Sequence, residues 1–111
     1  MAKKHIILSG FTMAAVSHIN YGMWRSPQDQ SYRYTSLEYW VNLAKLLDEN
    51  QFDCLFIADA LGLLDTWQGT PQASLAQGIQ SPLIDPLLLI SAMAAETRQL
   101  GFGVTVSTTY E

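Results

Sequence analysis

The fold of this 111-residue chain is decided by one stretch, Phe52-Asp53-Cys54-Leu55-Phe56-Ile57-Ala58-Asp59. Its apolar run, from Cys54 to Ala58, is short and unbroken, which is typical of a strand covered on both faces in a parallel sheet. Asp59 ends the run and would therefore lie at the carboxyl edge of the strand, where α/β proteins place their chemistry. We predict a strand over residues 52–58 with a candidate functional acid directly after it.

The residues before this stretch predict a strand, a long loop and a helix. The β-branched run Ile6-Ile7-Leu8 predicts the first strand. Residues 11–34 show no clear periodicity, and ordered loops of this length are usually functional. Thr35 and Glu38 have the spacing of a capping box, so they predict the start of a helix. Asn50 is a suitable left-handed residue for its end.

The residues after the stretch repeat this order. A second long connection, residues 61–81, contains a segment at 72–77 that is compatible with a short helix. Asp85-Pro86 predicts the start of the second main helix, with Asp as cap and Pro in the first turn. That helix is expected to be largely buried because it is apolar on two sides, one formed by Leu87, Ile90, Ala94 and Thr97 and the other by Leu88, Ala92 and Ala95. Residues 103–108 predict a third strand.

Strands that alternate with helices predict an α/β fold with a parallel sheet and right-handed crossovers. Both long connections follow a strand, so both lie at the carboxyl edge of the sheet, as in barrel and doubly wound enzymes. We therefore expect Asp59 and Thr105 to converge at one mouth, with the first loop folded over them. Because the third predicted strand has no helix after it, we expect the chain to be a piece of a longer protein.

Composition excludes several classes of function. A net charge of −4, with only six scattered basic residues, argues against nucleic acid or an anionic membrane as partner. No stretch approaches the roughly 20 apolar residues of a membrane span. The single cysteine, Cys54, fits a reducing compartment, so a cytoplasmic location is expected. The sequence contains no dinucleotide-binding, phosphate-loop or zinc-helix motif. Because it has only two histidines, we do not expect a His-rich metal site within this chain.

Several side chains are candidates for ligand contacts, and each has a structural alternative. Asp59 would orient a ligand or cap the next turn. Thr105 and Ser107 share one face of the predicted third strand, where hydroxyls line a pocket or only reflect the β-propensity of threonine. His18 would be a polar pocket wall or simply solvated, and Phe11, directly after the first predicted strand, would enter the same mouth.

The first loop also carries Trp24, which is suited to stacking on a planar ligand, and Arg25, which is suited to holding an anion. Asp53 and Asp59 lie at opposite ends of one predicted strand, so they do not form the carboxylate pair of a glycoside hydrolase.

In their order and spacing, several segments over nearly the whole chain resemble one family, the flavin-dependent monooxygenases of the bacterial-luciferase-like superfamily. The resemblance is to the branch with nitrilotriacetate, dibenzothiophene-sulfone and dimethyl-sulfide monooxygenases. It is carried by His18, Gly22-Met23-Trp24-Arg25, Leu43-Ala44-Lys45-Leu46-Leu47, residues 52–59, Asp85-Pro86, Met93-Ala94-Ala95-Glu96-Thr97 and residues 100–110.

The resemblance implies that residues 1–111 are the N-terminal segment of a single luciferase-like (β/α)8 TIM barrel, with its first three strands and two helices. It implies an oxidoreductase that takes reduced FMN from a separate NAD(P)H-dependent flavin reductase. The flavin would react with O2 to a peroxyflavin, which inserts one oxygen atom into a small organic substrate, such as an organosulfur compound or an amine. A homodimer is the family expectation for the full-length protein, and the isolated segment is expected to be inactive.

Residue by residue, the resemblance implies that Asp59 and Thr105 contact the flavin, with Ser107 as a second hydroxyl. It places Phe11, His18 and Phe56 near the substrate, and it identifies no catalytic residue and no metal ligand. The alternatives are a non-catalytic segment that folds or binds only with a partner chain, and another barrel enzyme such as a hydrolase. The substrate itself is not fixed by these residues.

Overall fold

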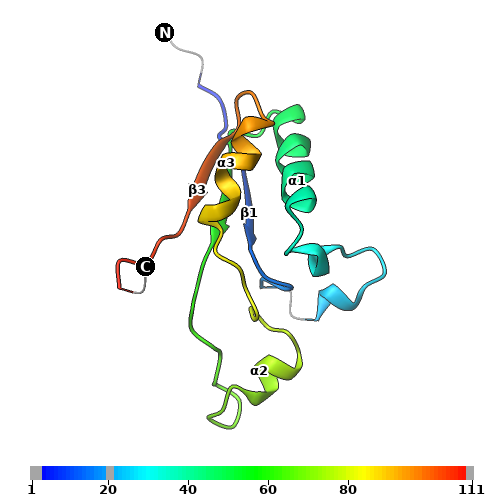
Figure 1. The fold of residues 1–111 in the computed structure, drawn as a ribbon, viewed down its shortest axis with the longest axis vertical. Helices are drawn as coiled ribbons and strands as arrows, with labels where there is room; N and C mark the ends of the chain where they lie inside the picture. Colours follow the sequence, from blue (N-terminus) through cyan, green and yellow to red (C-terminus); the bar gives the residue numbers. More distant parts are fainter. Residues whose placement is uncertain (1–3, 20–21, 110–111) are drawn as a thin grey trace.

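A computed structural model describes residues 4–19 and 22–109 of the chain. Three strands and three helices follow one another in the predicted alternation (Figure 1). They are β1 (Ser9–Met13), α1 (Leu37–Glu49), β2 (Cys54–Ala58), α2 (Gln72–Ala76), α3 (Leu87–Ala95) and β3 (Gly101–Val104), with short 3-10 turns η1 (Met23–Arg25) and η2 (Ser31–Arg33). The strands form a parallel sheet in the order β1-β2-β3, which confirms the predicted parallel topology.

The two longer helices, α1 and α3, cover the same face of this sheet (Figure 1). β2 shows the division most clearly, because Leu55 and Ile57 are buried against the helices whereas the Phe56 side chain is 36% exposed on the other face. The expectation that both faces of β2 are covered is therefore wrong for this chain. One face carries the core, and the opposite, helix-free face is open.

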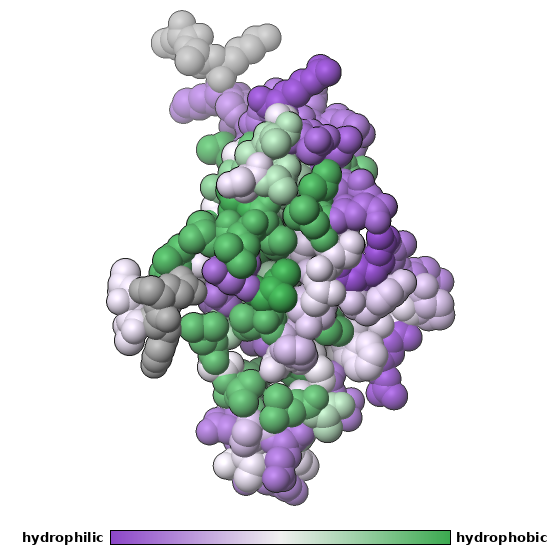
Figure 2. Space-filling model, in the orientation of Figure 1, coloured by the Kyte–Doolittle hydropathy of each residue, from purple (hydrophilic) through white to green (hydrophobic). Residues whose placement is uncertain are grey.

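The helix α3 begins as predicted but is not buried as predicted. The Asp85 carboxylate accepts a hydrogen bond from the Leu87 N–H, at 2.9 Å, which confirms the capping role of Asp85. Only one stripe of the helix, with Leu89 and Met93, is buried, because only that stripe meets α1 and the sheet. Leu88 is 78% exposed, and Figure 2 shows hydrophobic surface where Figure 1 places α3.

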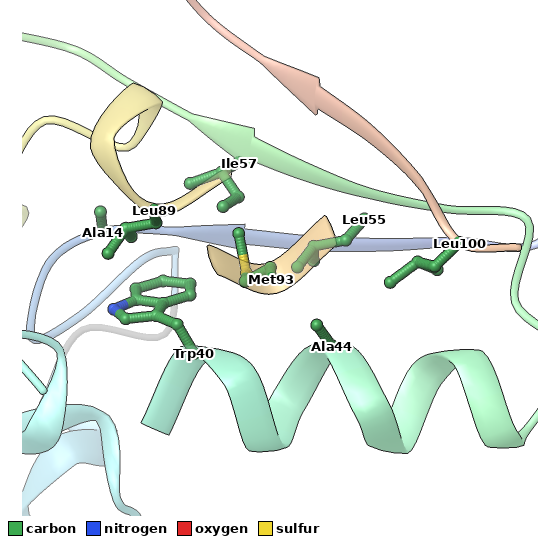
Figure 3. Close-up of a cluster of buried hydrophobic side chains, with 8 residues drawn as sticks. All are labelled: Ala14, Trp40, Ala44, Leu55, Ile57, Leu89, Met93 and Leu100. Carbon is green, nitrogen blue, oxygen red and sulfur yellow. The ribbon is translucent and has the colours of Figure 1, made fainter. Parts of the chain in front are cut away.

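The core lies between α1, α3 and the covered face of the sheet (Figure 3). Trp40 and Ala44 project from α1, Met93 from α3, and Ile57 from β2, and all four are fully buried. Burying a large apolar side chain contributes roughly 1.5–3 kcal/mol. The indole Nε1–H of Trp40 also donates to the Tyr34 carbonyl at 2.6 Å, so the polar part of this side chain is satisfied.

Both outer strands are shifted from their predicted positions. Ile6 and Ile7 are 83% and 72% exposed, and β1 begins only at Ser9, which pairs with Cys54 at the start of β2. The Leu8 carbonyl accepts from the N–H groups of Asp53 and Cys54, so sheet pairing starts there rather than at Ile6. At the other edge, β3 starts at Gly101, which also pairs with Cys54. Cross-strand register, not β-propensity, therefore fixes where the outer strands lie.

The ends of α1 also differ from the predicted ones. Ser36, not Thr35, precedes the first helical residue, and the Glu38 carboxylate pairs with the Arg33 guanidinium at 3.1 Å instead of reaching back to an amide. At the other end Asn50 has a φ of −94°, and the left-handed residue is Gln51, with a φ of 60°. The predicted short helix at 72–77 is confirmed by α2.

One carboxylate joins α1 to the turn that leads into β3. Asp48 accepts hydrogen bonds from the backbone N–H groups of Arg98, Gln99 and Leu100 at 2.9–3.0 Å. The N–H groups of Gln99 and Arg98 are the largest cause of a lowered Asp48 pKa, because they stabilise the ionised form. This contact lies at the edge where the strands begin, opposite the edge where they end. Over residues 4–19 and 22–109, no helix is long and apolar enough to cross a membrane.

Candidate functional site

The ends of β2 and β3 place Asp59 and Thr105 around one hollow. The two strands are parallel neighbours, with Ile57 paired to Val104, and the Thr105 N–H donates to the Ile57 carbonyl at 3.2 Å. The hollow has a volume of about 660 Å³ and is lined by Asp59, Ala60, Leu61, Gly62, Thr105 and Ser107. Small-molecule sites typically measure roughly 300–1,000 Å³. The predicted convergence of Asp59 and Thr105 is therefore observed, at the carboxyl edge of the sheet.

The polar side chains that line this hollow differ in whether they form hydrogen bonds within the chain. Among the described residues, neither the Asp59 carboxylate nor the Thr105 hydroxyl makes a hydrogen bond. The structural alternative for Asp59, capping of the next turn, is thus not observed within that part of the chain. Ser107 is engaged, since its Oγ accepts from the Thr109 N–H at 3.3 Å. Asp59 and Thr105 thus present an acceptor and a hydroxyl donor to the hollow, each directly after one of two neighbouring strands.

The predicted third strand ends earlier than expected, which changes the setting of its hydroxyls. β3 stops at Val104, so Thr105 and Ser107 lie just beyond the strand rather than within it. The threonine β-propensity offered as their structural explanation does not apply there. Their side chains line the hollow from the segment that follows Val104, the last paired residue of β3.

The three residues predicted near a substrate come together as an aromatic cluster. Phe11 stacks on Phe56, with ring centroids 5.5 Å apart, and meets the His18 ring edge-on at 4.7 Å. Phe11 lies inside β1 rather than after it, opposite Phe56 in the sheet register. Burial beside these rings lowers the His18 pKa, because desolvation disfavours the charged imidazole. His18 is therefore a neutral side chain near pH 7.

The first loop does not fold over Asp59 and Thr105, so that expectation is wrong. Trp24 and His18 line a second, smaller hollow of about 250 Å³, together with Phe11 and residues on either side of η1. The indole Nε1–H of Trp24 donates to the Gln77 carbonyl, at 2.9 Å. Arg25 is exposed, with its guanidinium carbon 6.0 Å from the Trp24 ring centroid. The first loop is thus attached to the second connection instead of covering the end of β3.

Gly103 lies against the aromatic cluster, a placement that was not predicted. It pairs with Phe56 in the sheet, and a Cβ atom placed on it would lie 2.9 Å from Phe56 Cδ2. Real Cβ contacts are essentially never that short, so the absence of a side chain leaves room for the Phe56 ring. The alternation in Gly101-Phe102-Gly103 was the available signal, because glycine inside a strand often marks a close approach.

Other acidic and metal-ligating residues are placed away from this edge. Asp53 lies at the start of β2, where its carboxylate accepts from the Leu8 N–H at 2.8 Å and pairs with His5 at 3.4 Å. A carboxylate pair with Asp59 is therefore not formed, as predicted. Over the described ranges, no three His, Cys, Asp or Glu side chains are grouped as they would be to hold a metal ion.

Comparison with known proteins gives close relatives over nearly the whole chain. It is 49% identical over 109 residues to dimethyl-sulfide monooxygenase of Hyphomicrobium sulfonivorans, a match that covers 98% of this chain and 23% of that protein. It is 47% identical over 108 residues to long-chain alkane monooxygenase of Geobacillus thermodenitrificans (strain NG80-2), a match that covers 97% of this chain and 24% of that one. The chain thus spans about a quarter of the length of these relatives. No family model matches it.

Solved structures agree with these relatives. The crystal structure of long-chain alkane monooxygenase matches with a TM-score of 0.94 and 47% identity, over 98% of this chain and 25% of that chain. A riboflavin lyase solved with modified FMN and its substrate riboflavin matches with a TM-score of 0.86 and 30% identity, over 97% of this chain and 24% of that chain. The predicted α/β fold class is confirmed by these superpositions on barrel enzymes.

Proposed function

Because the chain is homologous to luciferase-like monooxygenases over about a quarter of their length, we propose that it forms the N-terminal part of a flavin-dependent monooxygenase. The reaction would insert one O2-derived oxygen atom into a small organic substrate. The names of the relatives cover an alkane, dimethyl sulfide, dibenzothiophene sulfone and nitrilotriacetate, which support the reaction type and leave the substrate open.

The observation that carries this proposal is the pair Asp59 and Thr105, without hydrogen bonds among the described side chains, at one largely apolar hollow. The isoalloxazine ring of FMN has a flat apolar face and an edge with N–H and carbonyl groups. A carboxylate that accepts from the N–H and a hydroxyl that donates to a carbonyl fit that edge. When bound, reduced FMN supplies the activation of O2, while the protein supplies orientation and shielding from water.

The remaining predicted residues have a consistent place in this proposal. Ser107 lines the same hollow as a second hydroxyl. Phe11, Phe56 and the neutral His18 form an aromatic wall on the helix-free face of the sheet, where a substrate would meet apolar surface and one polar group. We propose these three as substrate-side residues.

A separate flavin reductase as partner is also part of the proposal. One relative is named as a component of nitrilotriacetate monooxygenase and another as a subunit of pristinamycin IIA synthase, and both names indicate systems of more than one part. An NAD(P)H-dependent reductase that delivers reduced FMN fits such systems. A cytoplasmic location, supported by the single free cysteine, and a homodimer are proposed with it.

The proposal is tested by titrating FMN into the complete protein and following the quenching of flavin fluorescence. Asp59→Asn keeps an acceptor oxygen but removes its charge, and a hydrogen bond to a charged group is worth roughly 1–1.5 kcal/mol more than a neutral one, so the Kd should rise about five- to tenfold. Thr105→Val removes a neutral hydrogen bond and should raise it by roughly two- to tenfold.

Asp65→Asn is the matched control, because Asp65 is an exposed carboxylate in the same connection and is not part of the hollow. Its Kd should equal that of the wild type. Equal FMN affinity of Asp59→Asn and the wild type, with both folded, would show that the flavin site is elsewhere.

A further inference from the structure

We propose that Ser17 and Trp24 are positioning residues that hold the second connection, residues 59–86, against the first connection, residues 14–36. In doing so they fix the wall of the hollow, residues 60–62, which lies far from both side chains along the chain. The inference rests on the proposed function for the identity of the ligand, but its geometry comes from contacts within this chain.

The two side chains bind adjacent carbonyl groups of the second connection. Ser17 is 6% exposed, and its Oγ–H donates to the Gly78 carbonyl at 2.8 Å. The Trp24 Nε1–H donates to the Gln77 carbonyl at 2.9 Å. The Trp24 ring also lies beside Gly78, where an added Cβ atom would be 3.7–4.0 Å from it, and Gly78 has a φ of 62°. Two donors from the first connection therefore hold one left-handed turn of the second.

The end of the second connection is fixed to the residues that follow β1. The Ile84 N–H donates to the Ala14 carbonyl at 3.0 Å, and Leu83 forms an antiparallel bridge with Ala15. Since the connection begins at the end of β2, it is held at its start, near its middle and at its end. Figure 1 shows α2 at the far tip of this long excursion from the sheet.

Two hydrogen bonds of Ser74 in α2 connect the turn at Gln77 and Gly78 to the residues next to the wall of the hollow. Ser74, which is 8% exposed, donates from its Oγ–H to the Leu64 carbonyl at 2.6 Å, and its own carbonyl accepts from the Ile79 N–H at 2.9 Å. Leu64 lies shortly after the wall residues Leu61 and Gly62. Freeing Gln77 and Gly78 would thus free α2 and, through Ser74, the wall.

The contacts of Ser17 and Trp24 are separate from the main core. Neither side chain belongs to the buried cluster around Trp40, Ile57 and Met93. Loss of their hydrogen bonds should loosen the second connection by local opening while the sheet and its helices stay folded.

The test compares Trp24→Phe, which removes the donor but keeps a ring, and Ser17→Ala with the wild type in the complete protein. Trp67→Phe is the matched control, because Trp67 lies in the second connection, as the wall does, but its side chain is 66% exposed and does not donate to Gln77 or Gly78. Limited proteolysis with chymotrypsin reports opening at the wall residue Leu61 and at Leu63, which follows the wall, with cleavage sites identified by mass spectrometry. Circular dichroism checks that each variant is folded.

Each of the two variants should be cut at the wall about fivefold faster than the wild type, the factor expected for loss of one ordinary hydrogen bond when cleavage follows the open population. The control should be cut at the wild-type rate. Equal rates for both variants and the wild type would overturn the inference.

Ligand affinity is a second measurement, because loosening of a loop away from the hollow would leave it unchanged. The Kd for FMN, or the KM for substrate, should rise in Trp24→Phe and Ser17→Ala with kcat less affected, and unchanged ligand affinity with faster cleavage would overturn the positioning role. If the wild type binds no FMN, the proposed function fails while the cleavage rates still decide whether these residues hold the wall.

Discussion

Substitution of Gly103 by alanine gives a prediction that can be worked from the structure. The new Cβ atom would lie 2.9 Å from Phe56 Cδ2 and 3.7 Å from Cε2, so the ring that stacks on Phe11 must shift. Overpacking of this kind costs roughly 1–3 kcal/mol. Replacing glycine at a compatible backbone conformation offsets roughly 0.4–1 kcal/mol by restricting the unfolded chain. We expect Gly103→Ala to lower the free energy of unfolding by about 1–2 kcal/mol.

The assay is a double-mutant cycle with Phe56→Ala, measured by urea unfolding. Without the phenyl ring there is no close contact, so Gly103→Ala should change sign and stabilise the protein by roughly 0.4–1 kcal/mol. The coupling energy between the two sites should then be about 1–3 kcal/mol. If Gly103→Ala has the same effect whether or not Phe56 is present, the close approach of these residues is not what excludes a side chain at position 103.

Two further predictions concern pH. The Asp48 pKa is lowered chiefly by the N–H groups of Gln99 and Arg98, so its ionised form adds stability above the ordinary Asp pKa of about 4, and this is lost as the pH falls through the lowered folded value. Asp48→Asn should therefore weaken the fall of the urea midpoint below about pH 4, and an unaltered acid profile would contradict the assigned hydrogen bonds. For His18, burial lowers the pKa, so an NMR titration should have its midpoint below the ordinary value of about 6.5, and a midpoint at or above it would refute burial as the dominant effect.

The sequence was sufficient to predict the features that depend on connectivity. Alternation of strands and helices implies parallel strands, and neighbouring parallel strands end at the same edge of the sheet. Asp59 and Thr105 therefore had to approach each other if both predicted strands were present. Their shared hollow follows from this rule and needs no knowledge of side-chain packing. The Asp85 cap was equally predictable, since capping depends on residues next to one another in the chain.

Features that depend on contacts between distant residues could not be predicted in this way. The run Ile6-Ile7-Leu8 has the propensity of a strand but no partner, because pairing with β2 begins at Ser9. The first loop, which carries Trp24, was expected to fold over Asp59 and Thr105, yet the hydrogen bond from Trp24 to the Gln77 carbonyl attaches that loop to the second connection. No local pattern indicates which carbonyl, more than fifty residues away, a tryptophan will find.

The most direct test of the central claim is a crystal structure of the complete protein with FMN bound. We predict that the edge of the isoalloxazine ring lies within hydrogen-bonding distance of the Asp59 carboxylate and the Thr105 hydroxyl, with the Phe11–Phe56 stack on the substrate side. A flavin bound with neither side chain in contact would contradict the account.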